Sequence, residues 1–124
     1  MSLSHKLVMA GVLFAAALGT GFWLGAAGTV AHALLMGTHK LLSLAAVVFV
    51  VMLAVHALRT GATGPLNIAA LIVLLLSAVA LIASGSVLTV PKLSGASWLN
   101  LHRVASVLGA LALAVTARLL TMKP

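Results

Sequence analysis

The sequence predicts an all-α integral membrane protein, a four-helix bundle that runs up-down-up-down. The first observation is composition: 64% of the 124 residues are hydrophobic, 6% are charged and the mean hydropathy is +1.32. A water-soluble domain of this size needs more polar surface than that composition supplies. The second is that four separate apolar runs each reach the roughly 20 residues that a spanning helix requires. The strict alternation of a β-barrel is absent, which leaves helices as the spanning structure.

The four spans are expected within one membrane domain, residues 1–124, at 7–28, 39–58, 66–87 and 99–120. Lys6 and the small residues of Ala31-His32-Ala33 are also features of a cleaved secretory signal. The first apolar run is longer than the roughly 7–15 residues of a signal core, so we expect a retained span. The stretch 61–65, GATGP, is a turn signal before the third span, and Pro91 and Gly95 interrupt the chain before the fourth.

The spans also form two weakly similar halves. A phrase of His, base, two residues and Ser occurs twice, 63 residues apart, as His39-Lys40-x-x-Ser43 and as His102-Arg103-x-x-Ser106. A hydroxyl–Gly pair ends the span before each phrase, Thr20-Gly21 in the first half and Ser84-Gly85 in the second. Two spans separate the copies, so both halves run in the same direction.

Composition excludes much chemistry. The chain has no Asp, Glu or Cys, so carboxylate acid–base pairs, thiolate nucleophiles, iron–sulfur clusters and covalent haem attachment are ruled out. Imidazole or a bound cofactor must carry any reaction. The net charge is +7, but the bases are scattered singly at the ends of apolar runs. They suit anionic lipid headgroups or the acid groups of a cofactor, not nucleic acid.

The paired histidines predict a haem b site. In an up-down-up-down bundle the second and fourth helices are parallel and diagonal, so His39 and His102 are expected at one membrane depth. Two neutral imidazoles supply the axial ligands that a haem iron takes on its opposite faces. Lys40 and Arg103 would either pair with the propionates or anchor the spans at the interface.

Four further residues belong to this predicted site. Ser43 and Ser106 lie one turn inward, where they would bond a backbone carbonyl or hold the imidazole tautomer; ordinary helix packing is the competing interpretation. Gly21 and Gly85 are expected to be small residues beside the flat ring. The two axial ligands leave iron no open position, which favours outer-sphere electron transfer over oxygen binding, so an electron carrier is expected rather than an enzyme.

The remaining histidines have no symmetric mate. His56 and His5 belong to the opposite membrane face, where a second haem between them is an alternative, although Arg118 stands where a partner histidine is needed. His32, Met36 and His39 would share one helix face, a donor set that suits copper. A Met at helical spacing is more often a packing residue.

The endings TG and SG of one span and the openings HK and HR of the next resemble small bacterial b-type cytochromes of the cytochrome b five-sixty-one superfamily. The resemblance implies bis-histidine haem b held by His39 and His102, with His56 as a further ligand. It also implies electron transfer across or along the membrane with quinone or superoxide as electron donor, and oxidoreductase activity toward either is left open. A redox protein is the other partner that we consider. Relatives with two haems carry another histidine near the far end of the later helix, where this chain has Ala117-Arg118-Leu119.

Two other function classes compete. Small residues at four-residue spacing, such as Gly11, Ala15 and Gly19, are typical of close helix packing and favour a cofactor-free membrane anchor or interaction subunit. A small transporter built on the repeat is the third class. Both halves point the same way, no helix is broken at a polar centre and no acid is present, all of which argue against it.

Basic residues predict the orientation. Lys6, Arg59, Arg118 and Lys123 lie on the side of the N-terminus, and Lys40, Lys92 and Arg103 lie on the other. If the two bases that follow His39 and His102 serve propionates, the positive-inside rule places both termini in the cytoplasm, in a bacterial inner membrane. The sequence predicts no oligomeric state.

Overall fold

In the computed structural model the described residues, 1–26 and 32–122, form four α-helices and no strand. Their bounds are α1 Leu3–Ala26, α2 His32–Arg59, α3 Pro65–Leu88 and α4 Ala96–Thr121. The all-α, four-helix class predicted from the sequence is confirmed. All four helices are long and apolar enough to cross a membrane, so the chain is an integral membrane protein.

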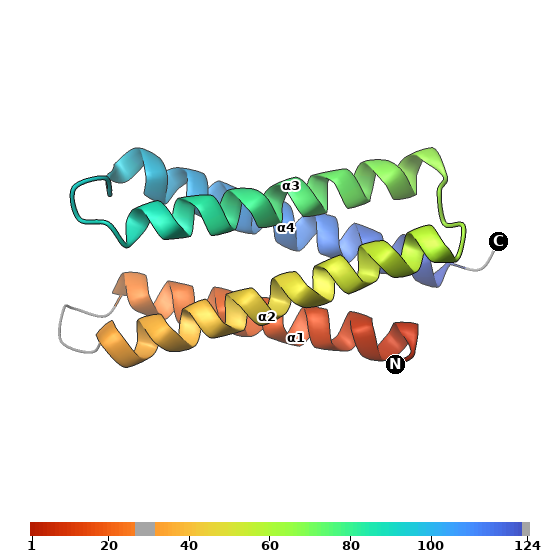
Figure 1. Cartoon of the computed structure of the whole chain (residues 1–124), viewed down its shortest axis with the longest axis horizontal. Coiled ribbons are helices and arrows are strands. Elements are labelled where there is room, and N and C mark those ends of the chain that lie inside the picture. Colours follow the sequence, from red (N-terminus) through yellow and green to blue (C-terminus); the bar gives the residue numbers. More distant parts are fainter. Residues whose placement is uncertain (27–31, 123–124) are drawn as a thin grey trace. The chain divides into compact units, whose positions relative to one another are not determined.

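The chain divides into two compact units, Met1–His56 and Ala57–Pro124. The first unit is built on the antiparallel pair α1 and α2, which touch through side chains near both of their ends. The second is built on α3 and α4, with the last residues of α2 attached. Figure 1 shows each pair as two helices running side by side. Each unit is one of the halves that the repeated phrase indicated.

The helices extend beyond the apolar runs that predicted them. α2 begins at His32, seven residues before His39, and α4 begins at Ala96, six residues before His102. At 1.5 Å per residue the two histidines lie about 10 Å and 9 Å along their helices. The expectation that they sit at the N-terminal ends of their helices was therefore wrong, because good helix formers such as Leu34, Leu35 and Met36 extend α2 ahead of His39. Residues 27 and 28 of the first predicted span lie outside the described residues.

The predicted turn at 61–65 closes α2 and opens α3. Gly61 adopts a φ of 74°, a conformation that an L side chain rarely takes. The amide of Gly61 donates to the Leu58 carbonyl and that of Ala62 to the Ala57 carbonyl, the pair of bonds that ends a helix in a Schellman motif. Pro65 then occupies the first position of α3, where its missing N–H costs no hydrogen bond.

Small residues dominate the buried positions. The second unit buries these: Ala57, Ala70, Leu71, Leu74, Ser77, Ala78, Ser84, Ala105, Gly109, Ala112, Leu113 and Thr116. Side chains of this size let helix backbones approach closely, which is how helices associate in lipid. Large apolar side chains point outward on all four helices, among them Val8, Leu41, Leu76 and Leu111. The lipid bilayer is the solvent that suits such a surface.

Candidate functional site

His39 is held by the neighbouring helix of its own unit. Its Nδ1 lies 2.9 Å from the carbonyl oxygen of Ala17 and 3.1 Å from Oγ1 of Thr20, both on α1. A carbonyl oxygen only accepts hydrogen bonds, so Nδ1 must carry the proton. In the neutral ring Nε2 then carries the lone pair. This is the tautomer in which an imidazole coordinates a metal through Nε2.

The Thr20 hydroxyl agrees with that assignment. Its Oγ1 lies 2.9 Å from the Ala16 carbonyl and 3.1 Å from the Ala17 carbonyl, and it donates its one proton to them. Its oxygen can therefore only accept from His39. Threonine suits this position in a spanning helix, because its hydroxyl bonds the preceding turn and needs no water.

His102 is held in the same way in the second unit. Its Nδ1 lies 2.9 Å from Oγ of Ser84 on α3, a residue with no exposed surface. Ser84 Oγ lies 2.6 Å from the Ala80 carbonyl, to which it donates its proton. The serine oxygen therefore accepts from Nδ1–H of His102. Both histidines of the repeated phrase thus carry the proton on Nδ1.

Gly21 and Gly85 make the room for these rings. A Cβ placed on Gly21 would lie 2.9 Å from Cε1 of His39, and one on Gly85 would lie 3.3 Å from Cε1 of His102. Both separations are shorter than an ordinary carbon–carbon contact of about 3.5 Å or more. The two glycines were expected to be small beside a flat ring, and the ring that the structure places against each is an imidazole.

Ser43 and Ser106 bond the backbone of their own helices. Ser43 Oγ donates to the His39 carbonyl at 2.7 Å, and Ser106 Oγ donates to the Arg103 carbonyl at 2.7 Å. This is the first of the two roles that the sequence left open for them. The groups that fix the tautomer are instead Thr20 and Ser84, which sequence reasoning recorded only as part of the repeat. The signal was their spacing, 19 and 18 residues before the histidines.

Lys40 and Arg103 are the bases that directly follow the two histidines. Each is exposed, and neither side chain forms a hydrogen bond to any part of the chain that the structure describes. The chain contains no acidic side chain that could neutralise them. They are thus placed to meet anions from outside the chain, whether lipid headgroups or cofactor carboxylates.

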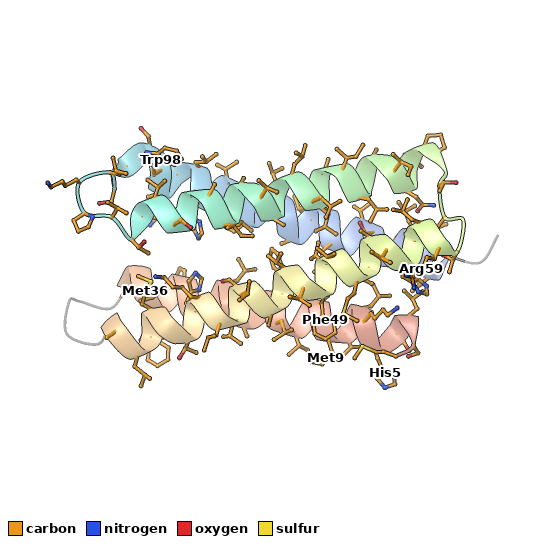
Figure 2. The ribbon with its side chains drawn as sticks, viewed as in Figure 1. His5, Met9, Met36, Phe49, Arg59 and Trp98 are labelled. Atoms are coloured by element: carbon orange, nitrogen blue, oxygen red, sulfur yellow. The ribbon has the colours of Figure 1, made fainter. Side chains whose placement is uncertain are left out.

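One exposed tryptophan marks the membrane level of each site. Trp23 follows Thr20 by three residues on α1, and Trp98 precedes His102 by four on α4, where Figure 2 labels it near the start of the helix. Tryptophan concentrates at the membrane–water interface. The helical rise then puts each His-binding position roughly 4–6 Å inside that level. In each unit the histidine site therefore lies at about the same distance along the helix from a tryptophan.

His56 and His5 have different surroundings. Nζ of Lys6 donates to Nδ1 of His56 at 3.4 Å, so Nδ1 of His56 accepts and a neutral ring carries its proton on Nε2. His5 is exposed and its Nδ1 lies 2.6 Å from Ser2 Oγ. Figure 2 shows the His5 side chain on the side of α1 turned away from α2. The contacts of the first unit therefore do not bring His5 and His56 together.

The copper site predicted from His32, Met36 and His39 lies partly outside the described residues. His32 is the first residue of α2, but its side chain lies outside the described residues, so its relation to Met36 and His39 is not defined. Within the described residues no three His, Cys, Asp or Glu side chains gather in a group that could hold a bare metal ion.

Comparisons with known proteins leave the family open. No protein-family model, curated protein or solved structure matches this chain. The resemblance to the cytochrome b five-sixty-one superfamily therefore stays a prediction from the sequence.

Proposed function

We propose that this protein is a membrane-embedded electron-transfer protein that binds haem b through His39 and His102. The observation that carries the proposal is the repetition within each unit. One hydroxyl and one glycine on the neighbouring helix hold each histidine with its proton on Nδ1. A histidine that only anchors a span at the interface does not require a matched hydroxyl and glycine on the neighbouring helix. Two histidines fixed in the ligating tautomer fit the donor set of a six-coordinate haem.

The hydrogen bonds at Nδ1 have a chemical consequence. A ligating imidazole that donates its other N–H to an oxygen has a fixed ring orientation and a more basic ligating nitrogen. Thr20, the Ala17 carbonyl and Ser84 supply that interaction here. The haem itself would supply one-electron exchange. With His39 and His102 as its ligands the iron would have no open coordination position, which favours electron transfer with a quinone or a redox protein over binding of a substrate to iron.

Lys40 and Arg103 are assigned to the haem propionates. Each follows a proposed ligand directly, is exposed and has no acidic side chain in the chain to pair with. With the site near the tryptophan level, these cations reach the headgroup region, where carboxylates are hydrated. Excluding the two bases from the positive-inside count places both termini in the cytoplasm of a bacterium, with the haem near the outer face of the inner membrane.

This orientation has a direct test, because the chain has no cysteine. A single thiol introduced by Ser2→Cys or by Ser94→Cys would be the only one present. In intact cells a membrane-impermeant maleimide should label S94C and leave S2C unlabelled until the cells are broken. Labelling of S2C in intact cells contradicts the orientation.

The haem assignment is tested on the full chain purified in detergent and titrated with haemin. We expect one haem per chain, sharp bands in the reduced-minus-oxidised spectrum and a low-spin bis-imidazole electron paramagnetic resonance signal. His39→Ala and His102→Ala should each abolish that signal, because six-coordination needs both imidazoles. His5→Ala is the matched control, and it should bind haem like the wild type.

Two results contradict the proposal. One is a folded protein that takes up no haemin. The other is a spectrum that His39→Ala and His102→Ala leave unchanged. A haem that survives both substitutions but is lost in His56→Ala would move the site to the other end of the first unit. A stoichiometry of two haems would indicate the second site that the sequence left open at His5 and His56.

A cofactor-free anchor or interaction subunit is the competing function. The observation in its favour is on α1, where Gly11, Ala15 and Gly19 are exposed and a Cβ on either glycine meets no described atom within 4 Å. Such a stripe suits close contact with another helix. A colourless preparation that retains a stoichiometric partner protein, and that haemin leaves unchanged, supports this function over the first.

A further inference from the structure

The first unit carries a second polar contact, far from the His39 site. Nζ of Lys6 on α1 lies 3.4 Å from Nδ1 of His56 on α2, and the pair is partly buried. Lys6 precedes Thr20 by 14 residues, which is about 21 Å along α1. The contact therefore belongs to the opposite end of this helix pair. It joins two basic residues, which the proposed haem site does not use.

The positive charge of Lys6 in this contact has no acidic side chain to neutralise it. The chain contains no Asp or Glu, so no acidic side chain can neutralise the Lys6 ammonium. Lys6 also lies near the N-terminus of α1, the positive end of the helix dipole, and the first turn holds no acidic residue. A partly buried cation in such a place is costly unless an anion pairs with it.

We propose that Lys6, positioned by His56, binds the phosphate of a net-anionic phospholipid. An ammonium has three N–H donors, and the contact with His56 uses one of them. Lys6 is the fourth residue of a spanning helix, about 5 Å from its first residue, which is the level of lipid headgroups. Val8 and Met9, directly along the chain, are exposed and apolar, and Figure 2 shows Met9 on the outside of α1. A lipid offers acyl chains to these residues, and a free phosphate ion does not.

The test measures lipid retention by the full chain. Protein stripped of lipid in detergent is incubated with phosphatidylglycerol, with phosphatidylcholine or with inorganic phosphate, and native mass spectrometry counts what stays bound. We expect preferential retention of phosphatidylglycerol. Lys6→Gln should lower that retention about fivefold, as expected for loss of one basic residue near the membrane surface. Lys6→Arg should keep most of it.

Two further variants distinguish binding at Lys6 from a general effect of the net positive charge on lipid retention. Lys92→Gln removes an exposed base from the connection between α3 and α4, with the same change in net charge. It should leave retention unchanged. His56→Leu removes the group that positions Lys6, so it should lower retention as Lys6→Gln does. Circular dichroism of each variant must show the helix content of the wild type.

Three outcomes overturn the proposal. The wild type could retain both lipids equally, Lys6→Gln could behave like Lys92→Gln, or inorganic phosphate could displace the lipid, which would make the site one for a soluble anion. The proposal does not depend on haem. Lys6→Gln should leave the haemin titration unchanged, so failure here and failure of the haem assignment are separate results.

Discussion

The two helix pairs hold their histidines through the same kind of hydrogen bond, but the space around the two imidazole rings differs. In the first unit Nδ1 of His39 has two oxygens within 3.1 Å, and the Cβ position of Gly21 is 2.9 Å from the ring. In the second, Ser84 accepts at 2.9 Å and the Cβ position of Gly85 is 3.3 Å from its ring. The shared feature is the protonated Nδ1. The crowding around the ring differs between the copies.

The two helix pairs differ at the end far from His39 and His102. The first unit has the Lys6–His56 contact there, whereas the second buries Thr116 at 2% exposure with no hydrogen-bond partner for its Oγ1 among the described residues. The repetition is therefore confined to the region of His39 and His102.

The largest difference between the units should come from their glycines. Gly21→Ala pushes a methyl group against His39, and overpacking of this kind costs about 1–3 kcal/mol of unfolding free energy. Replacing Gly by Ala inside a helix otherwise stabilises by about 1 kcal/mol. We therefore expect a net loss for Gly21→Ala and a near-neutral result for Gly85→Ala, measured by thermal unfolding in detergent.

Gly19→Ala is the control on the same helix. Its Cβ meets no described atom within 4 Å, so it should show the helix-propensity gain alone. The expected order of stability is Gly19→Ala, then Gly85→Ala, then Gly21→Ala. Equal stability of the last two would mean that the two rings are equally crowded.

Removing the hydroxyl that contacts each histidine should have its larger effect in the second unit. Ser84→Ala removes a hydroxyl acceptor of Nδ1 of His102, whereas Thr20→Val leaves the Ala17 carbonyl as an acceptor for Nδ1 of His39. Loss of a group that orients a metal ligand typically lowers metal affinity about 10–100-fold. Ser84→Ala should therefore weaken haemin binding by that factor, and Thr20→Val by less.

Nitrogen-15 spectra of the histidines test, without haem, which ring nitrogen carries the proton. The wild type should show His39 and His102 protonated on Nδ1 and neutral His56 protonated on Nε2. Ser84→Ala should shift the His102 signals, and Ser86→Ala, which removes an exposed hydroxyl two residues further along α3, should not. An Nε2–H tautomer at either His39 or His102 would remove the argument for ligation.

The smallest expected effect is a gain in stability from a substitution in the second unit. Thr116→Val replaces a buried hydroxyl that has no partner with a methyl group of nearly the same shape. Leaving a buried polar group unpaired costs about 1–3 kcal/mol, so the variant should be more stable by roughly 1 kcal/mol at most after repacking. Thr121→Val is the control, since Thr121 already bonds the Ala117 carbonyl at 2.8 Å. It should not stabilise.

Hydropathy predicted the helices well and their ends less well. All four spans are present, but α2 starts at His32 and not at His39. A sum over about 20 side chains locates a span without fixing its first turns, and the backbone hydrogen bonds of α2 continue through the segment 32–38 ahead of His39. Similarly, the repeated phrase singled out His39 and His102. It left two roles open for Ser43 and Ser106, and it did not show that Thr20 and Ser84 contact the two rings.

The sequence by itself determined the bilayer as solvent, the four spans and the exclusion of acid and thiol chemistry, because each follows from composition summed along the chain. It also paired the two histidines through an internal repeat. Only the tertiary structure decided which groups touch them. A hydrogen bond between Thr20 and His39, or between Ser84 and His102, depends on the register and rotation of two packed helices. Packing of small residues along both helices sets that register, and no single helix encodes it.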